Sequence, residues 1–163
     1  VIDEIATLEN LEELEIIGQD LTSIDGLGVL PNLVELELND MMSLTDFSDL
    51  ASLGTLRSLD VGLTGYGADP ATGDWVAGLT NLEYVDIRGT TLIAPQGDNG
   101  SVTGEELDGL VAFFQDPNTE VFADGGTLDL GRPSDAYYNA NQSSFTALED
   151  AGLTLEYEIW PLE

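Results

Sequence analysis

Apolar and polar residues follow one repeated order along the first part of the chain. Four segments share the order L-x-x-L-x-x-L-x-L, with leucine, isoleucine or valine at the apolar positions, and they begin at Leu8, Leu30, Leu53 and Leu79. The end of each segment alternates apolar and polar residues, which predicts a short β-strand with its apolar side chains inward. Strands this short are not stable alone, so we expect them to stack in parallel around one shared leucine core.

The stretches between these segments predict short helical turns on the outer side of the stack. Phe47, Leu50 and Leu53 are three residues apart, which is the spacing of one side of a 3₁₀ or short α-helical segment. Residues 24–30 and the opening residues 2–8 share the form I-D-x-x-x-x-L. The chain therefore begins inside a repeat, and we expect part of one more repeat upstream.

The repeat resembles the leucine-rich repeat family, in particular the class of about 22 residues found in internalins and other bacterial surface proteins. The resemblance covers residues 1–92. It implies an α/β solenoid with a short parallel concave sheet and outer helical turns, serving as a non-enzymatic protein-interaction module. The asparagine ladder of the family is degraded, because its places hold Gln19, Met41, Thr64 and Thr90.

A second polar position recurs just before each predicted strand. It is occupied by a residue with a short polar side chain in every copy: Asn10, Asn32, Thr55 and Asn81. Such side chains stabilise turns by bonding to nearby backbone groups. We expect each one to bond within its own turn at the entry to the strand.

The pattern changes after residue 100 and predicts a fused α/β cap. Residues 103–106 form a T-x-x-E capping box ahead of a helix that ends before Pro117. A further L-x-L strand follows at 127–131. Ser143 or Ser144 is expected to begin a second helix that ends at Gly152. A last strand spans 153–159. We therefore divide the chain into a repeat array, 1–100, and a capping subdomain continuous with it, 101–163.

Charge excludes several classes of function. The 163 residues contain 32 acidic side chains against three arginines, with no lysine, histidine or cysteine, for a formal net charge of −29. So acidic a chain cannot neutralise a nucleic-acid backbone, and it has no apolar run long enough to span a bilayer. The missing residue types also remove the usual zinc sites and nucleophilic triads, so we predict no enzymatic activity.

The residues between the strand leucines predict a polar face on the sheet. Successive repeats should place acids side by side there, and Asp129 extends the row if 127–131 joins the sheet. We interpret this face, with the Gly- and Asp-rich loop 62–75, as the binding site for a protein with a basic patch. The alternative is that the whole surface is equally acidic. The candidate contact residues are Glu13, Glu15, Glu35, Glu37, Asp60, Tyr84, Asp86 and Arg88.

Two acidic stretches are weak candidates for calcium, and no other cofactor is indicated. Residues 98–106 resemble the second half of an EF-hand loop, with Asp98, Asn99 and Glu106 as oxygen ligands, although the capping box also explains Glu106. Asp69 and Asp74 form the other candidate pair.

Two functions lead, and a carboxylate-dependent glycoside-cleaving enzyme, which would need a cleft with two isolated, buried acids, is a third alternative. The first is the binding module, which we expect to be a bacterial monomer, secreted or at the cell surface. The second is a structural spacer or cap of a larger surface protein from a salt-adapted host, with no ligand of its own; the cytoplasm of a halophile is the other possible location. Complete absence of lysine supports salt adaptation.

Overall fold

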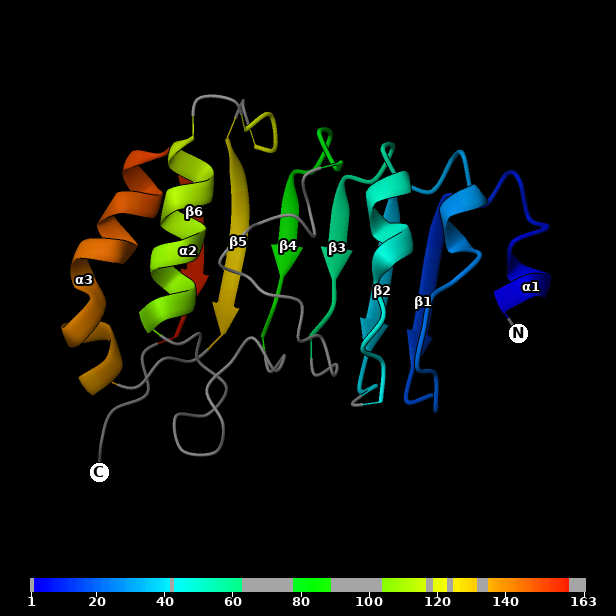
Figure 1. Cartoon of the computed structure of the whole chain (residues 1–163), viewed down its shortest axis with the longest axis horizontal. Coiled ribbons are helices and arrows are strands. Elements are labelled where there is room, and N and C mark those ends of the chain that lie inside the picture. Colours follow the sequence, from blue (N-terminus) through cyan, green and yellow to red (C-terminus); the bar gives the residue numbers. More distant parts are fainter. Residues whose placement is uncertain are drawn as a thin grey trace.

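The computed structural model describes residues 2–41, 43–62, 78–88, 104–116, 119–122, 125–131 and 135–158. Six strands form one sheet in sequence order, and every pairing is parallel (Figure 1). The elements are α1 (Ile2–Ile5), β1 (Glu13–Ile17), η1 (Leu27–Val29), β2 (Glu35–Asn39), η2 (Ser48–Ser52), β3 (Ser58–Asp60), β4 (Tyr84–Asp86), α2 (Gly104–Gln115), β5 (Gly126–Gly131), α3 (Asp135–Asp150) and β6 (Leu153–Tyr157).

The register of the strands confirms the predicted leucine-rich repeat solenoid. The inward residue of each rung pairs with its equivalent in the next, in the order Leu14, Leu36, Leu59, Val85, Leu128 and Leu155. From Leu36 to Leu128 these side chains are completely or almost completely buried. Each such burial stabilises the fold by about 2 kcal/mol, and the parallel register joins the contributions into one continuous core.

The expected helical turns are present on one side of the sheet. The three-residue spacing of Phe47, Leu50 and Leu53 forms the 3₁₀ segment η2, with Leu50 and Leu53 buried. The preceding segment η1 packs against it. Asp49 joins the two segments, because its Oδ2 accepts the backbone N–H groups of Gly26 at 2.7 Å and Gly28 at 3.2 Å.

The polar residues before the strands bond across rungs, and our expectation of local bonding was wrong. The Asn32 side-chain amide donates to the Glu9 carbonyl at 2.7 Å, and the Thr55 hydroxyl donates to the Leu33 carbonyl at 2.7 Å. Asn81 donates to the Gly54 carbonyl at 2.6 Å. Stacking places a carbonyl of the preceding rung within hydrogen-bond distance of each side chain, so these side chains tie neighbouring rungs together.

Strands β5 and β6 continue the sheet, and two helices cover one side of it. Helix α2 packs against α3, and α3 against β6 (Figure 1). Helix α3 begins at Asp135, so the prediction that Ser143 or Ser144 caps it was wrong; the helix is broken at Asn141, whose φ is −119°. An acid in the first turn suits the positive end of the helix dipole. Gly152, at φ +97°, ends α3 as expected.

Within the described residues, no helix has the length and apolar character needed to cross a membrane.

Candidate functional site

The register brings six acids into one row across the sheet, which we call the acid row. Each member faces its neighbour on the next strand: Glu15, Glu37, Asp60, Asp86, Asp129 and Glu156. The predicted extension to Asp129 is therefore confirmed. Parallel strands lie about 4.8 Å apart, so like charges stand close enough to repel.

A second row lies on the same face, two residues earlier in each strand. It begins with Glu13 and Glu35 and then becomes neutral: Ser58, Tyr84, Thr127 and Thr154. Acid density is therefore highest at β1 and β2, where both rows carry carboxylates.

The acid row is exposed at both ends, at Glu15 and Glu156, and buried in its middle. Glu13, Glu15 and Glu35 are exposed, and Glu37 and Asp60 are half-buried. Asp86 is 0% exposed and Asp129 is 9% exposed. The acids expected on the outer face are therefore exposed or half-buried from β1 to β3 and buried in β4 and β5.

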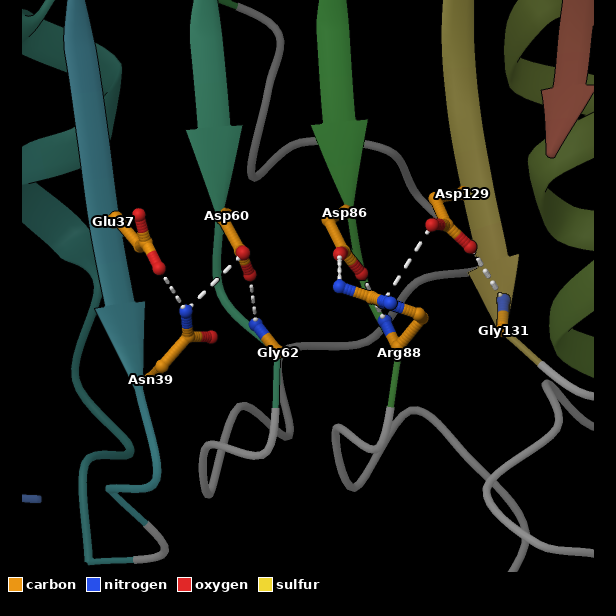
Figure 2. A network of polar contacts seen from close by, with 8 residues as sticks. All are labelled: Glu37, Asn39, Asp60, Gly62, Asp86, Arg88, Asp129 and Gly131. Carbon is orange, nitrogen blue, oxygen red and sulfur yellow. Dashed lines mark hydrogen bonds and ion pairs between the residues drawn. The ribbon is translucent and has the colours of Figure 1, made fainter. Parts of the chain in front are cut away.

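The three aspartates of the row share one local contact at the ends of their strands (Figure 2). The Oδ1 atoms of Asp60, Asp86 and Asp129 each accept, at 2.8 Å, the backbone N–H group two residues ahead, in Gly62, Arg88 and Gly131 respectively. This contact fixes the turn that leaves the strand. The recurring D-x-G and D-x-R spacing is a signal for it in the sequence, and the sequence analysis missed it.

Arg88 supplies the positive charge in the buried part of the row. Its guanidinium lies 2.5 Å from Asp86 Oδ2 and 3.5 Å from Asp129 Oδ2 (Figure 2). Asp86 Oδ2 is buried and has no aligned hydrogen bond in the described structure, so it is stabilised by this charge contact. The contact with Asp86 also raises the pKa of Arg88.

Asn39 has the corresponding position between Glu37 and Asp60. Its side-chain amide donates to Glu37 Oε1 at 2.6 Å and to Asp60 Oδ2 at 3.2 Å (Figure 2). A neutral amide satisfies these oxygens without removing their charge. The pKa of Asp60 is raised, mainly because the carboxyl is partly buried, and the nearby charge of Asp86 adds to this.

Burial shifts two further groups in the closed part of the face. The pKa of Asp129 is raised by burial and by the charge of Asp86, while the Gly131 N–H and Arg88 act in the opposite direction. The pKa of Tyr84 is raised by burial and then by Asp86 and Asp129. Both shifts indicate a region where water solvates negative charge poorly.

The open part of the face has no cationic partner among the described residues. The structure describes two arginines. Arg88 pairs with Asp86 of β4 and Asp129 of β5, and Arg57 pairs with the exposed Glu83 just before β4. Glu13, Glu15 and Glu35 are left without a described ion pair. Carboxylates held this close together attract cations in general.

The candidate calcium ligands fall largely beyond what the structure describes. Asp69, Asp74, Asp98 and Asn99 lie outside the described residues, as does the loop 62–75 apart from Gly62. Glu106 lies within α2. Among the residues described, no three acidic side chains come together in a way that would hold a metal ion.

Comparison with known proteins gives a likeness in structure but none in sequence. No family model matches the sequence, and no curated protein matches it. The fold is similar to an internalin, InlF, from Listeria monocytogenes strain 4b F2365, with 15% sequence identity and a TM-score of 0.38. The match covers 98% of this chain and 54% of the internalin, so the chain spans about half the length of that structure. The assignment of the fold therefore depends on the strand register described above.

Proposed function

We propose that the protein binds another protein with a basic patch through the open end of its polar face, formed by Glu13, Glu15, Glu35 and Glu37. Stacked-repeat folds present extended surfaces that commonly bind other proteins. The observation that carries the proposal is the pairing of Glu13 with Glu35 and of Glu15 with Glu37, with no described cation between them. Four like charges held this close favour a cationic partner.

The buried middle of the row, at β4 and β5, has a different role in this proposal. Asp86 has no surface to offer a partner, so we assign Asp86 and Arg88 to holding the ends of β4 and β5 in place. Asp60 and the half-buried Tyr84 form the border of the binding face. We also assign the loop 62–75, which follows β3 in the sequence, to the binding surface.

The test compares two triple variants with the same change in net charge. The first is Glu13→Gln/Glu15→Gln/Glu35→Gln. The second is Glu120→Gln/Glu149→Gln/Asp150→Asn, which changes exposed acids away from this face. Both are used to capture proteins from extracts of the source organism at low and high salt. We expect only the first variant to lose a salt-sensitive partner; equal loss in both would show that net charge, and not this face, is recognised.

The alternative is a structural part of a larger surface protein in a salt-adapted host. Exposed acids also occur far from the polar face, for example Asp3, Asp25 and Asp150, which favours general adaptation to salt. In this alternative, residues 101–163 close the end of the repeat array. The two triple variants and the parent protein should then capture the same proteins. In both cases we propose a non-enzymatic monomer, and a location outside the cell or at its surface.

A further inference from the structure

The residue two positions after a member of the acid row can connect that acid to the next strand. Asn39 donates to the acids of β2 and β3, and Arg88 pairs with those of β4 and β5 (Figure 2). Gly62 has the same position after β3, and it has no side chain. Within the described residues, no side chain therefore connects Asp60 of β3 with Asp86 of β4.

Three oxygen atoms surround the space that a side chain at Gly62 would occupy. A Cβ atom at this position would lie 3.0 Å from Asp60 Oδ1, 3.1 Å from Asn39 Oδ1 and 3.3 Å from the Arg88 carbonyl oxygen. Asn39 Nδ2 donates to two carboxylates, which fixes the amide with its Oδ1 toward Gly62 (Figure 2). A carboxylate, an amide and a main-chain oxygen thus meet at one point between the ends of β2, β3 and β4.

All three of these atoms are hydrogen-bond acceptors. In the described part of the chain, no N–H or O–H group donates to Asn39 Oδ1 or to the Arg88 carbonyl, and Asp60 Oδ1 accepts only the Gly62 N–H. A single water molecule has two hydrogens, so it could satisfy only two of the three oxygens. A cation can contact all of them at once, and the site therefore favours a cation.

The local charge also favours a cation. Asp60 forms no ion pair with a described residue, whereas Asp86 and Asp129 share Arg88. The pKa of Asp60 is raised by burial and then by the charges of Asp86 and Glu37. A bound ion would compensate this negative charge.

The type and spacing of the oxygens suit calcium. Carboxylate, carbonyl and water ligands favour hard cations. Magnesium requires oxygens at about 2.0–2.1 Å in octahedral geometry and gives up its waters reluctantly, whereas calcium accepts a flexible geometry at about 2.3–2.6 Å. The three oxygens lie 3.0–3.3 Å from the Cβ position, so they need to move less to contact calcium. The surplus of negative charge favours a divalent ion over sodium or potassium.

We propose that Asn39 Oδ1, Asp60 Oδ1 and the Arg88 carbonyl bind a calcium ion in the space beside Gly62, with water as the remaining ligands. The ion would connect the ends of β2, β3 and β4, as Asn39 and Arg88 connect the neighbouring pairs of strands. The inference does not rest on the proposed function, because the exposed glutamates of β1 and β2 are not part of the site.

Calcium itself is the probe, added to chelator-treated, isotope-labelled protein in about 0.15 M KCl, which screens the general attraction to acids. We expect saturable NMR shifts of the Gly62 amide and of the Asn39 side-chain amide. The dissociation constant should be about 10⁻⁴–10⁻³ M, as in extracellular calcium modules. Magnesium should bind about tenfold more weakly, or not at all.

Gly62→Ala fills the space and leaves every acid in place. The backbone of Gly62 is outside the left-handed region, so alanine causes no backbone strain there. We expect about tenfold weaker calcium binding. Gly54→Ala is the matched control, because its Cβ would meet only the Gly78 carbonyl, at 3.9 Å, and it should bind calcium as the parent does.

Asn39→Asp tests the same site by a gain of affinity and does not depend on how well Gly62→Ala folds. It replaces the amide oxygen with a charged one, so calcium should bind about tenfold more tightly and should raise the urea midpoint. Gln142→Glu makes the same change of charge at an exposed position of α3 and should leave both measurements unchanged.

Three results would overturn the inference. If calcium shifts the amides of all exposed acids equally, and Gly62→Ala binds as the parent does, the chain attracts cations only through its net charge. If KCl alone gives the shifts expected for calcium, or magnesium binds equally well, the site does not select calcium. If Gly54→Ala or Gln142→Glu changes calcium binding as much as the variants at the site, the effect is not local.

Discussion

The beginning and the middle of the acid row have the same sequence pattern and opposite surroundings. At β1 and β2 the carboxylates of Glu15 and Glu37 are partly or fully in water and have no described cation. At β4 and β5, Asp86 and Asp129 are buried beside Arg88 and accept backbone N–H groups. One set of acids is available for recognition, and the other stabilises the ends of strands. An acid on the polar face of a solenoid therefore cannot be assigned a role from its position in the repeat alone.

The largest difference in stability between the two regions should come from the core beneath them. Leu59 is completely buried, whereas Leu14 is half-buried. We expect Leu59→Ala to lower the free energy of unfolding by about 3 kcal/mol, because it leaves a cavity. Leu14→Ala should cost about 1 kcal/mol, since less apolar surface is lost. Urea unfolding measures both, and equal losses would show that the first rung is as well packed as the third.

The next largest effect concerns Arg88, beside the buried middle of the row. Arg88→Met should lower the free energy of unfolding by about 2–3 kcal/mol, because the buried Asp86 carboxylate loses its countercharge. Arg57→Met is the matched control. Its exposed pair with Glu83 should contribute less than about 1 kcal/mol. If Arg57→Met lowered the free energy of unfolding as much as Arg88→Met, the buried ion pair would contribute no more than an exposed one, and the distinction between the two regions of the row would fail.

The pH dependence of stability should come from the middle of the row. The pKa values of Asp60 and Asp129 are raised in the folded chain, mainly by burial. The folded chain then binds protons at a pH where the unfolded chain, with a pKa of 3.8, has released them. Stability is therefore lowest above the raised pKa values and increases as pH falls through them toward 3.8. We expect the urea midpoint to rise on acidification, and to rise less in Asp129→Asn.

Asp46 is a reference of opposite sign for this experiment. Its pKa is lowered because its carboxylate accepts the Ser48 backbone N–H, so its contribution is present at neutral pH and is lost as pH falls below 3.8. Asp46→Asn should therefore make the rise on acidification slightly larger. A urea midpoint that falls steadily from neutral pH would contradict the assignment of raised pKa values to the row.

The sequence predicts the fold well because the leucine spacing has a direct physical consequence. Inward leucines at equivalent positions can share one core only if their strands run parallel and in register, and this gave the pairing of Leu36 with Leu59 and the acid row itself. The cross-rung bond of Asn32 was predictable from the repeat length, but its side chain was assigned to a local turn. The start of α3 was misplaced because serine is a common cap, whereas this helix begins with an acid.

The burial of Asp86 is not encoded in the repeat. Its neighbours in sequence resemble those of Asp60 and Glu37. Its burial arises from pairing with strands far apart in the chain, whereas its contact with Arg88 is local, two residues away. Only the D-x-R spacing indicates that its carboxylate bonds to the backbone.

The smallest expected effect is electrostatic repulsion at the open end. Glu15 faces Glu37 on the next strand, so Glu15→Gln should raise the free energy of unfolding by about 0.5 kcal/mol in dilute buffer. In about 1 M NaCl, where charges are screened beyond about 3 Å, the gain should disappear. Glu120→Gln changes the net charge equally in the turn before β5 and should give a smaller gain. The parent protein should itself become more stable with salt, because its net charge of −29 is screened. A urea midpoint unchanged between low and high salt would mean that like-charge repulsion does not limit its stability, and that the open acids are already compensated in the folded chain.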